Sequence, residues 1–193
     1  ILPLGTINVI ARELGIPAGS QDAARVIARN RRSRLDLGRV GERYFVNMAG
    51  IGFDAFVMRR ADRTFKKALG ATAYLVIGAV NLLRYPFHRM KVYVDDQPIA
   101  RHGYLVIVGN GRFYGGDIVV APQARVDDGL LDVCIFKHRE LTSRIRYLVH
   151  MKRGDITQSA DVEYYQCRRM RILGGHQYIH ADGEYVGRTP VEI

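Results

Sequence analysis

Hydrophobic and polar residues alternate along much of this chain, and a period of two is typical of β-strands with one buried face. The alternation continues through 34–50 on both sides of a Val-Gly-Glu turn, which predicts a hairpin. Two strands are expected around an Asp-Asp-Gln-Pro turn within 91–111, and another over 130–136. More strands follow between 161 and 193. The pattern predicts an α+β chain that is mostly β with inserted helices, built as a two-layer β-sandwich.

Three segments change to a helical period. A short helix within 8–17 stops at Gly15, and a second helix within 19–32 has Ser20 as its expected N-cap. A long amphipathic helix is predicted within 138–154. Its apolar residues share one side of the helix: Leu141, Ile145, Leu148 and Val149.

An uncharged run over 68–83 is shorter than the roughly 20 residues that cross a bilayer. It predicts a helix that packs against a sheet or lies at an interface and that ends before Pro86.

Composition narrows the class of protein. A chain of 193 residues that is 48% hydrophobic can form one domain, or one domain with part of a neighbour. Cys134 and Cys167 lie within strand-like runs without metal-ligand spacing. They are therefore expected to be buried free thiols in a reducing compartment rather than a disulfide, which indicates a cytoplasmic protein.

The net charge of +10 favours a polyanionic partner, such as nucleic acid, an anionic membrane surface or a phosphorylated cofactor. Nucleic acid is the weakest of these, because no base-stacking motif accompanies the basic residues. The charge could equally serve solubility alone.

Two stretches near glycines leave alternatives open. Gly5, Thr6 and Asn8 stand at the mouth of a helix, where they could contact a phosphate or simply cap the helix. The Ala-Gly-Ile-Gly stretch lacks the third glycine of a dinucleotide fingerprint. Asp54 after it is either an active-site carboxylate at a strand end or the N-cap of a helix that starts at Ala55.

Two Asp-Gly turns are also ambiguous. Asp128 lies before Gly129 in a glycine-rich loop, where it could bind Mg²⁺ or form an ordinary turn. Asp182 and Glu184 flank a second turn, where the two carboxylates could perform general-base chemistry or merely decorate a hairpin.

Taken in order, five segments resemble one family: "PLGTINVIARELGIP", "AGIGFDA", "KKALGATAYL", "GNGRFYGGDIVVAPQARVDDGLLDV" and "HADGEYVGRTPVEI". They are similar to the bacterial soluble diacylglycerol kinases and the sphingosine-kinase-like lipid kinases. The resemblance implies a two-domain enzyme with an NAD-kinase-like architecture. Residues 1–32 would be the end of the nucleotide-binding α/β domain, and 33–193 the C-terminal β-sandwich. The family's Gly-Gly-Asp-Gly-Thr loop is expected before Ile1, so this chain alone is expected to be inactive.

The resemblance implies transfer of the ATP γ-phosphoryl group to the hydroxyl of diacylglycerol or a related lipid, with Mg²⁺. It assigns Gly5, Thr6 and Asn8 to the nucleotide. It makes Asp182 and Glu184 near-equal candidates for the catalytic base, and it places Asp54 in an acidic network that couples the metal to the catalytic end. A second, regulatory or structural Mg²⁺ would be held by the Asp128 side chain and the carbonyl groups of two neighbours, Arg125 and Leu130.

The implied partners are a lipid substrate at the inner membrane surface and anionic lipid headgroups. The basic residues of the helix within 138–154 are a candidate surface for those headgroups. A homodimer is a further expectation. The alternatives are an NAD kinase-like enzyme and a non-catalytic lipid-binding protein that keeps the fold.

Overall fold

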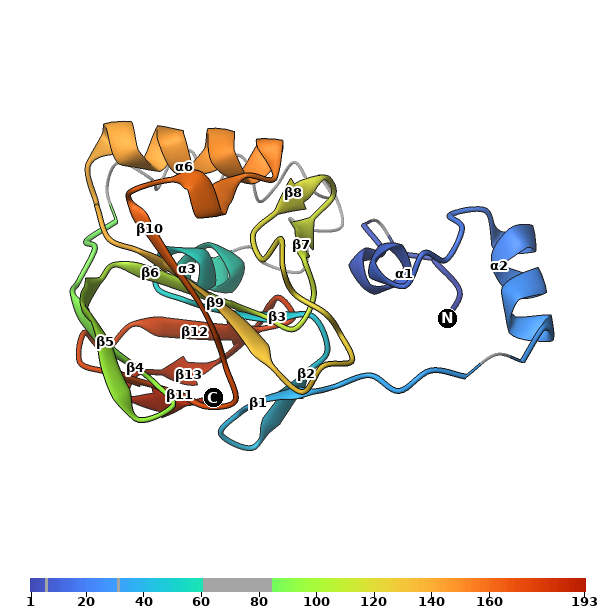
Figure 1. The fold of residues 1–193 in the computed structure, drawn as a ribbon, viewed down its shortest axis with the longest axis horizontal. Helices are drawn as coiled ribbons and strands as arrows, with labels where there is room; N and C mark the ends of the chain where they lie inside the picture. Colours follow the sequence, from blue (N-terminus) through green and yellow to red (C-terminus); the bar gives the residue numbers. More distant parts are fainter. Residues whose placement is uncertain (6, 31, 61–84) are drawn as a thin grey trace.

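The computed structural model describes residues 1–5, 7–30, 32–60 and 85–193. Two stacked antiparallel sheets form its centre, and helices cover the outer side of the larger sheet (Figure 1). The predicted two-layer sandwich is therefore confirmed. The predicted helix over 68–83 lies outside the described residues.

The larger sheet has six strands in the order β10-β9-β6-β3-β12-β13, and all neighbours pair antiparallel. The strands are β3 (Met48–Ile51), β6 (Leu105–Gly109), β9 (Leu131–Phe136), β10 (Val162–Cys167), β12 (Tyr178–Ala181) and β13 (Glu184–Arg188). The central strand β3 is buried along its whole length. Side chains on it must therefore be small or apolar.

The smaller sheet has the order β14-β11-β4-β5. Its strands are β4 (Met90–Val94), β5 (Gln97–Gly103), β11 (Met170–Leu173) and β14 (Val191–Glu192). The main core fills the space between the two sheets with Phe45, Ile51, Val106, Ile135, Ile172 and Ile179, among others. Two short hairpins belong to neither of these sheets: β1 (Gly38–Val40) with β2 (Arg43–Phe45), which contributes to the main core, and β7 (Phe113–Gly115) with β8 (Ile118–Val119).

Helix α6 (Leu141–Arg153) covers the outer face of the six-stranded sheet, followed by the short η1 (Ile156–Gln158) (Figure 1). A second core between them contains Phe136, Tyr147 and Ile156. Helix α3 (Phe53–Arg60) directly follows β3 and contacts β12 and β13. Among the described residues, no helix is long and apolar enough to cross a membrane.

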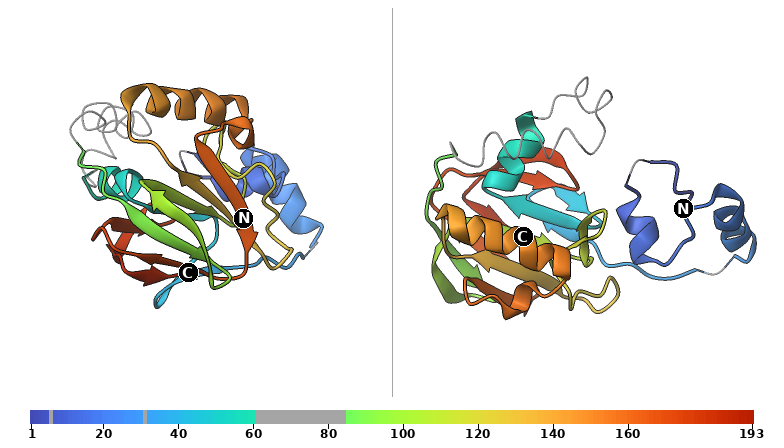
Figure 2. Two further views of the ribbon diagram at one scale, coloured as in Figure 1. Left: turned by 60° about the vertical axis from the view of Figure 1, so that its left-hand side comes forward. Right: turned by 90° about the horizontal axis from the view of Figure 1, so that it is seen from above.

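The N-terminal segment lies to one side of the sandwich in every view (Figures 1 and 2). It contains α1 (Val9–Glu13) and α2 (Ser20–Ala28). Helix α1 contacts the β7 strand, and an extended stretch then leads from α2 back to β1. Gly15 adopts a positive φ of 64° after α1, as a helix stop requires, which confirms that expectation.

Three local expectations were wrong. Helix α2 already includes Ser20, and its N-cap is Gly19. Helix α3 begins at Phe53, so Asp54 lies inside its first turn rather than at the N-cap. The second strand expected within 91–111 is two strands, because the chain bends at Tyr104 as it passes from β5 in one sheet to β6 in the other.

The two cysteines are free and buried, as predicted. Burial raises the pKa of the Cys167 thiol to about 12, and it also raises the pKa of Cys134. A thiol must ionise and be reached by the reagent in order to react.

We therefore predict that neither thiol reacts with Ellman's reagent in the folded protein at pH 8 within an hour. Both should react within minutes in 6 M guanidinium chloride. The absorbance of the released thionitrobenzoate measures this, and rapid native labelling would show that one of the strands opens.

Candidate active site

Three loops meet at one end of the central strands of the six-stranded sheet. Met48 at the start of β3 pairs with Gly109 at the end of β6, and Ala49 pairs with Ala181 at the end of β12. Because β3 is antiparallel to both neighbours, the segment before β3, the loop after β6 and the turn after β12 come together there. This end of the central strands brings together residues that are far apart in the sequence.

The carboxylate of Asp182 holds the turn after β12 against the start of β3. It accepts hydrogen bonds from three successive backbone N–H groups, those of Val46 (2.7 Å), Asn47 (2.9 Å) and Met48 (3.0 Å). The N–H group of Asp182 donates to the carbonyl of Met48 in return. Asp182 is thus a structural acceptor whose carboxylate is occupied by the backbone.

Glu184 differs from Asp182 although it lies only two residues away. Its side chain is 70% exposed, and its carboxylate forms an ion pair of 2.8 Å with Arg43. Both residues are exposed, so the structure separates the two carboxylates by their partners: backbone N–H groups bind Asp182, and an arginine side chain pairs with Glu184.

A buried network lies behind this turn. His180 and Asp54 are 2% and 6% exposed, and the Nε2 atom of His180 lies 2.5 Å from the Asp54 carboxylate. The Nδ1 atom of His180 accepts the N–H of Gly183 (3.2 Å), so Nε2 carries the proton that is donated to Asp54. The hydroxyl of Tyr114 donates to the other oxygen of Asp54.

Gly50 makes the contact between His180 and Asp54 possible. A Cβ atom at this position would lie 2.0 Å from a carboxylate oxygen of Asp54 and 2.4 Å from Nε2 of His180. The glycine of the Ala-Gly-Ile-Gly stretch therefore serves close packing inside the domain. His180 was missed by sequence reasoning, since its only signal is its position two residues before Asp182.

The N-terminal segment docks beside the loop after β6. The Glu13 carboxylate accepts hydrogen bonds from the side chain (2.8 Å) and the backbone N–H (2.9 Å) of Arg112. Arg12 pairs with Asp117 at 2.5 Å. Gly111 favours this approach, because a Cβ atom there would lie 3.3 Å from the Glu13 carboxylate and 2.7 Å from the Asn47 side chain. Helix α1 is thereby placed near the end of the central strands that carries Asp182.

Two buried amides lie at this end of the central strands. Asn47 donates to the carbonyl of Phe113, and Asn110 donates to the carbonyls of Asp36 and Val46. Among the described residues, the Oδ1 atoms of both amides have no hydrogen-bond partner. Buried acceptors without partners are costly, and they mark places where a ligand or an ordered water can bind.

The expected nucleotide-binding residues are described in part. Asn8 has a positive φ of 50° and makes no side-chain cap to α1. Its side chain instead accepts the N–H of Gly5 (2.8 Å) and donates to the carbonyls of Gly5 and Pro3. Asn8 thus occupies the N-cap position of α1, as the capping alternative expected, but its side chain closes the Pro-Leu-Gly turn instead of capping the helix. Thr6 lies outside the described residues.

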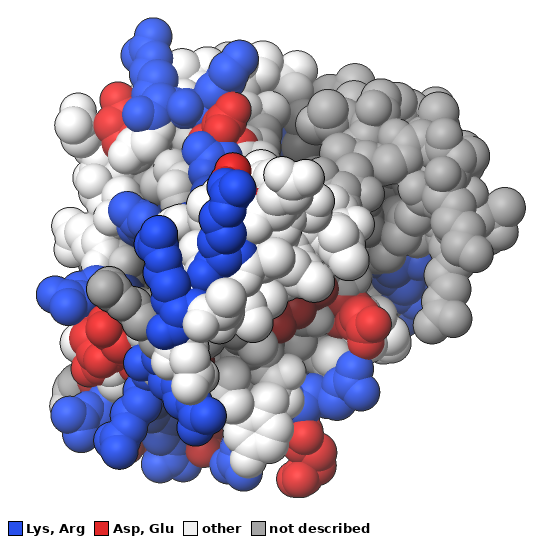
Figure 3. All heavy atoms as spheres, turned by 90° about the vertical axis from the view of Figure 1, so that its right-hand side faces the viewer, with Lys and Arg blue, Asp and Glu red and all other residues white. Residues whose placement is uncertain are grey.

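Lys and Arg side chains spread over the face of the molecule that carries α1 and α2, with Asp and Glu in smaller groups among them (Figure 3). Basic side chains thus predominate on the side that holds the expected nucleotide residues. Such a face attracts a polyanion such as ATP.

The expected regulatory metal loop forms an Asx turn. Oδ1 of Asp128 accepts the N–H of Leu130 (3.0 Å), and Asp36 accepts the N–H of Gly129 (2.7 Å). A carboxylate with two backbone carbonyls is an all-oxygen donor set, which suits Mg²⁺ with waters completing its coordination. No group of three Asp, Glu, His or Cys residues able to hold a metal ion occurs among the described residues.

Asp54 and Asp128 have separate partners in the described part of the chain. The hydrogen bonds of Asp54 go to His180 and Tyr114, and those of Asp128 stay within its own loop. The expected coupling of Asp54 to the metal remains a prediction.

Asp132, which pairs with Gly109 on the neighbouring strand, is a buried acid that sequence reasoning missed. Burial raises its pKa, although hydrogen bonds from Tyr164 and Gln166 oppose this.

Comparison with known families gives two matches along the chain. Residues 47–193 match the YegS C-terminal NAD kinase beta sandwich-like domain, and residues 1–40 match the diacylglycerol kinase catalytic domain.

Curated relatives agree with these matches. A probable lipid kinase YegS-like of Chromohalobacter salexigens is 32% identical over 95% of this chain and 60% of its own length. One of Pseudomonas aeruginosa is 40% identical over 70% of this chain and 44% of its own length. A diacylglycerol kinase of Staphylococcus saprophyticus is 26% identical over 98% of this chain and 63% of its own length. The chain thus spans less than two thirds of these relatives.

The fold is also found among solved structures. A putative diacylglycerol kinase from Bacillus anthracis superposes with a TM-score of 0.78 at 25% identity, covering 100% of this chain and 63% of that one. The chain is therefore similar along its whole length to part of a solved structure.

The close contact at Gly50 leads to a stability prediction. Gly50→Ala should lower the free energy of unfolding by about 1–3 kcal/mol, because the new methyl group must displace Asp54 or His180. Gly115→Ala is the control, since a Cβ atom there meets nothing within 4 Å. Its change should stay within about 0.5 kcal/mol. Urea unfolding followed by circular dichroism measures both, and equal effects would contradict the described packing.

The two carboxylates of the turn should differ in stability as they differ in partners. Asp182→Ala removes the acceptor of three N–H groups and should cost about 2–4 kcal/mol. Glu184→Ala removes one exposed ion pair and should cost less than about 1 kcal/mol. The same urea titration compares them. A reversed order would show that the turn is held by Glu184.

Proposed function

The chain belongs to the family of YegS C-terminal NAD kinase beta sandwich-like domains, and on that basis we propose that the protein transfers the γ-phosphoryl group of ATP to the hydroxyl of diacylglycerol or a related lipid. Relatives that bear the names of lipid kinases support the phosphotransferase class. The observation that carries the proposal is the exposed Glu184 carboxylate, which lies beside a turn whose other carboxylate is occupied by backbone N–H groups.

Glu184 acts as the general base in this proposal. Phosphoryl transfer needs a group that accepts the proton of the attacking hydroxyl, and that group must be reachable from solvent or substrate. Glu184 meets this requirement with a 70% exposed side chain, and its pairing with Arg43 restrains the carboxylate. Asp182, with its oxygens bound by the backbone, positions Glu184 rather than accepting the proton.

His180 and Asp54 are positioning residues in the same proposal. Asp54 fixes the imidazole, and the imidazole accepts the N–H of Gly183 inside the turn. The turn that carries Glu184 is thus held from two sides, by backbone N–H groups in front and by His180 behind. A fixed base is favourable because misplacement by about 1 Å can cost two orders of magnitude in rate.

The nucleotide would lie on the side of α1. Gly5, Thr6 and Asn8 would contact its phosphates, and the contact of Glu13 with Arg112 supports this placement by docking α1 beside the loop after β6. When bound, Mg²⁺ supplies charge neutralisation of the phosphate oxygens. A regulatory or structural Mg²⁺ would be held by the Asp128 carboxylate and the carbonyls of Arg125 and Leu130.

Glu184→Gln tests the assignment of the base. In the full-length protein, we expect kcat/KM for diacylglycerol to fall about 100- to 10,000-fold, because the amide cannot accept the hydroxyl proton. The unfolding temperature should stay unchanged, since the pair with Arg43 is exposed. Transfer of ³²P from ATP to the lipid measures the rate.

Glu163→Gln is the matched control. Glu163 lies on β10, at the opposite edge of the sheet from β13, and forms an ion pair with Lys137. Loss of this pair should leave the rate unchanged. Activity of Glu184→Gln within tenfold of the native protein would remove Glu184 as the base. Labelling of NAD without any lipid would identify an NAD kinase-like enzyme, and no labelling at all would favour a non-catalytic lipid-binding protein.

A further inference from the structure

The outer side of α6 exposes a row of large apolar side chains. Leu141, Ile145, Leu148 and Val149 are 45%, 53%, 52% and 41% exposed, and their spacing places them on one side of the helix. Sequence reasoning grouped these residues correctly. The structure turns their side outward, away from the sheet, so the helix carries a second apolar face that the described core does not use.

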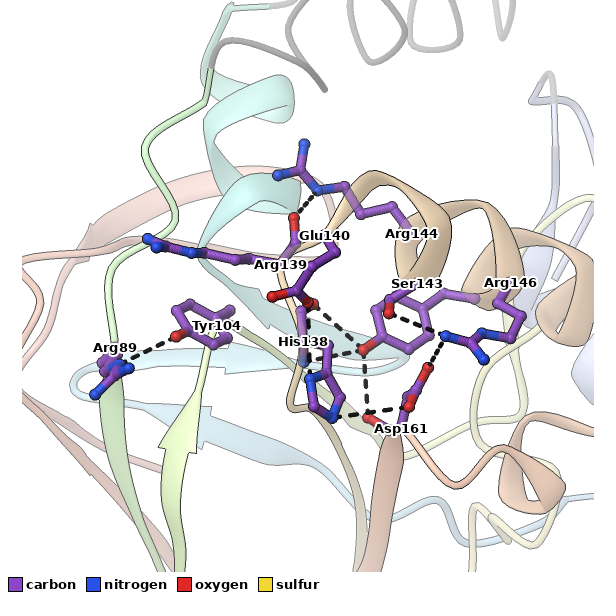
Figure 4. A network of polar contacts seen from close by, with 10 residues as sticks. Arg89, Tyr104, His138, Arg139, Glu140, Ser143, Arg144, Arg146 and Asp161 are labelled. Carbon is purple, nitrogen blue, oxygen red and sulfur yellow. Dashed lines mark hydrogen bonds and ion pairs between the residues drawn. The ribbon is translucent and has the colours of Figure 1, made fainter.

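The opposite side of α6 is fixed to the domain. Tyr147 is buried and packs edge-on against Phe136, and its hydroxyl accepts the N–H of His138 (3.0 Å). Arg146 pairs with Asp161 at 2.8 Å, and Figure 4 shows both with Ser143 on the inner part of this network. These contacts determine which way the helix faces, so the apolar row is held outward by the fold.

Basic residues flank the apolar row. Residues 137–153 contain six Lys or Arg and a single Glu. Figure 4 shows Arg139 and Arg144 at the beginning of the helix, where Arg144 donates to the carbonyl of Arg139 and lies 4.1 Å from the Phe87 ring. Lys152 and Arg153 are exposed in the last turn.

This arrangement fits the surface of an anionic membrane. An apolar row bordered by cations is the pattern of helices that lie in the plane of a bilayer, with the apolar side among the acyl chains and the cations at the phosphates. A helix of 13 residues is too short to cross the bilayer. A second copy of this chain fits less well, because a two-fold contact would bring the same cations face to face.

We propose that α6 is a membrane-docking helix that inserts Leu141, Ile145 and Leu148 into the interface of a bilayer containing anionic lipids. The inference stands on the geometry and charge of α6 and does not require the proposed kinase activity. If that activity holds, the helix brings the domain to the surface in which the lipid substrate resides.

Vesicle binding without nucleotide tests the proposal in the full-length protein. The double variant Ile145→Ser/Leu148→Ser should bind vesicles of 30% phosphatidylglycerol and 70% phosphatidylcholine at least tenfold more weakly than the native protein, by cosedimentation. The control is Leu37→Ser/Leu173→Ser, which changes two leucines of similar exposure away from α6. Its binding should be unchanged, and both variants should unfold at the native temperature.

The charges provide a second measurement. Lys152→Gln/Arg153→Gln should reduce the preference for anionic over pure phosphatidylcholine vesicles, and 0.5 M NaCl should reduce it further. Vesicle binding by Ile145→Ser/Leu148→Ser at the native strength would overturn the proposal. So would loss of a dimer in that variant, measured by sedimentation velocity, while vesicle binding persists.

A kinase assay separates this proposal from the proposed function. Ile145→Ser/Leu148→Ser should phosphorylate a short-chain diacylglycerol in solution at the native rate and lose activity only on vesicles. A protein that binds vesicles through α6 but phosphorylates no lipid would refute the kinase and leave the docking helix in place. Equal activity of this variant on vesicles and in solution would refute the docking helix.

Discussion

The candidate active site depends on one carboxylate that is turned toward the backbone. Asp182 accepts three successive N–H groups from a segment as far as 136 residues away in the sequence. This contact joins the end of β12 to the start of β3 and sets where the following residues point. Both residues are exposed, and they differ in their partners: backbone N–H groups for Asp182 and the Arg43 side chain for Glu184. In the proposed function, the chemistry and the restraint of the turn are divided between two acids that the sequence presents as near equals.

The loops of the candidate site are positioned by the central strands of the sheet, at whose ends they lie. β3 is buried along its length and is flanked by β6 and β12, so the elements that support the site are among the least exposed in the domain. The proposed docking surface has the opposite character. It lies on a helix that packs against the domain on one side only, and its apolar residues are not part of the described core. The two proposals therefore place reaction and membrane attachment on separate surfaces of one sandwich.

Much of the architecture follows from local pattern. The alternation of apolar residues was enough to predict the sandwich. The Asp-Gly-Glu stretch left a catalytic turn and an ordinary hairpin turn open, and only the family resemblance favoured the first. The different partners of Asp182 and Glu184 could not be predicted, since they depend on N–H groups of Val46 to Met48 that are distant in sequence. The same holds for His180, whose partner Asp54 is 126 residues away. Helix periodicity predicted that the apolar residues of α6 share a side, but periodicity does not reveal which of two apolar sides a sheet will cover.

The order of the central strands has a consequence for synthesis. β3, β6 and β12 are neighbours in the sheet, yet they are far apart in the sequence, at Met48–Ile51, Leu105–Gly109 and Tyr178–Ala181. A nascent chain on the ribosome cannot close this sheet until β12 has emerged, and contacts between such distant segments make folding slow. Until then β3, which is apolar and has no charged residue, lacks one of its neighbours. During translation, an apolar strand that is fully buried in the finished domain is therefore exposed to non-native contacts until β12 has been made.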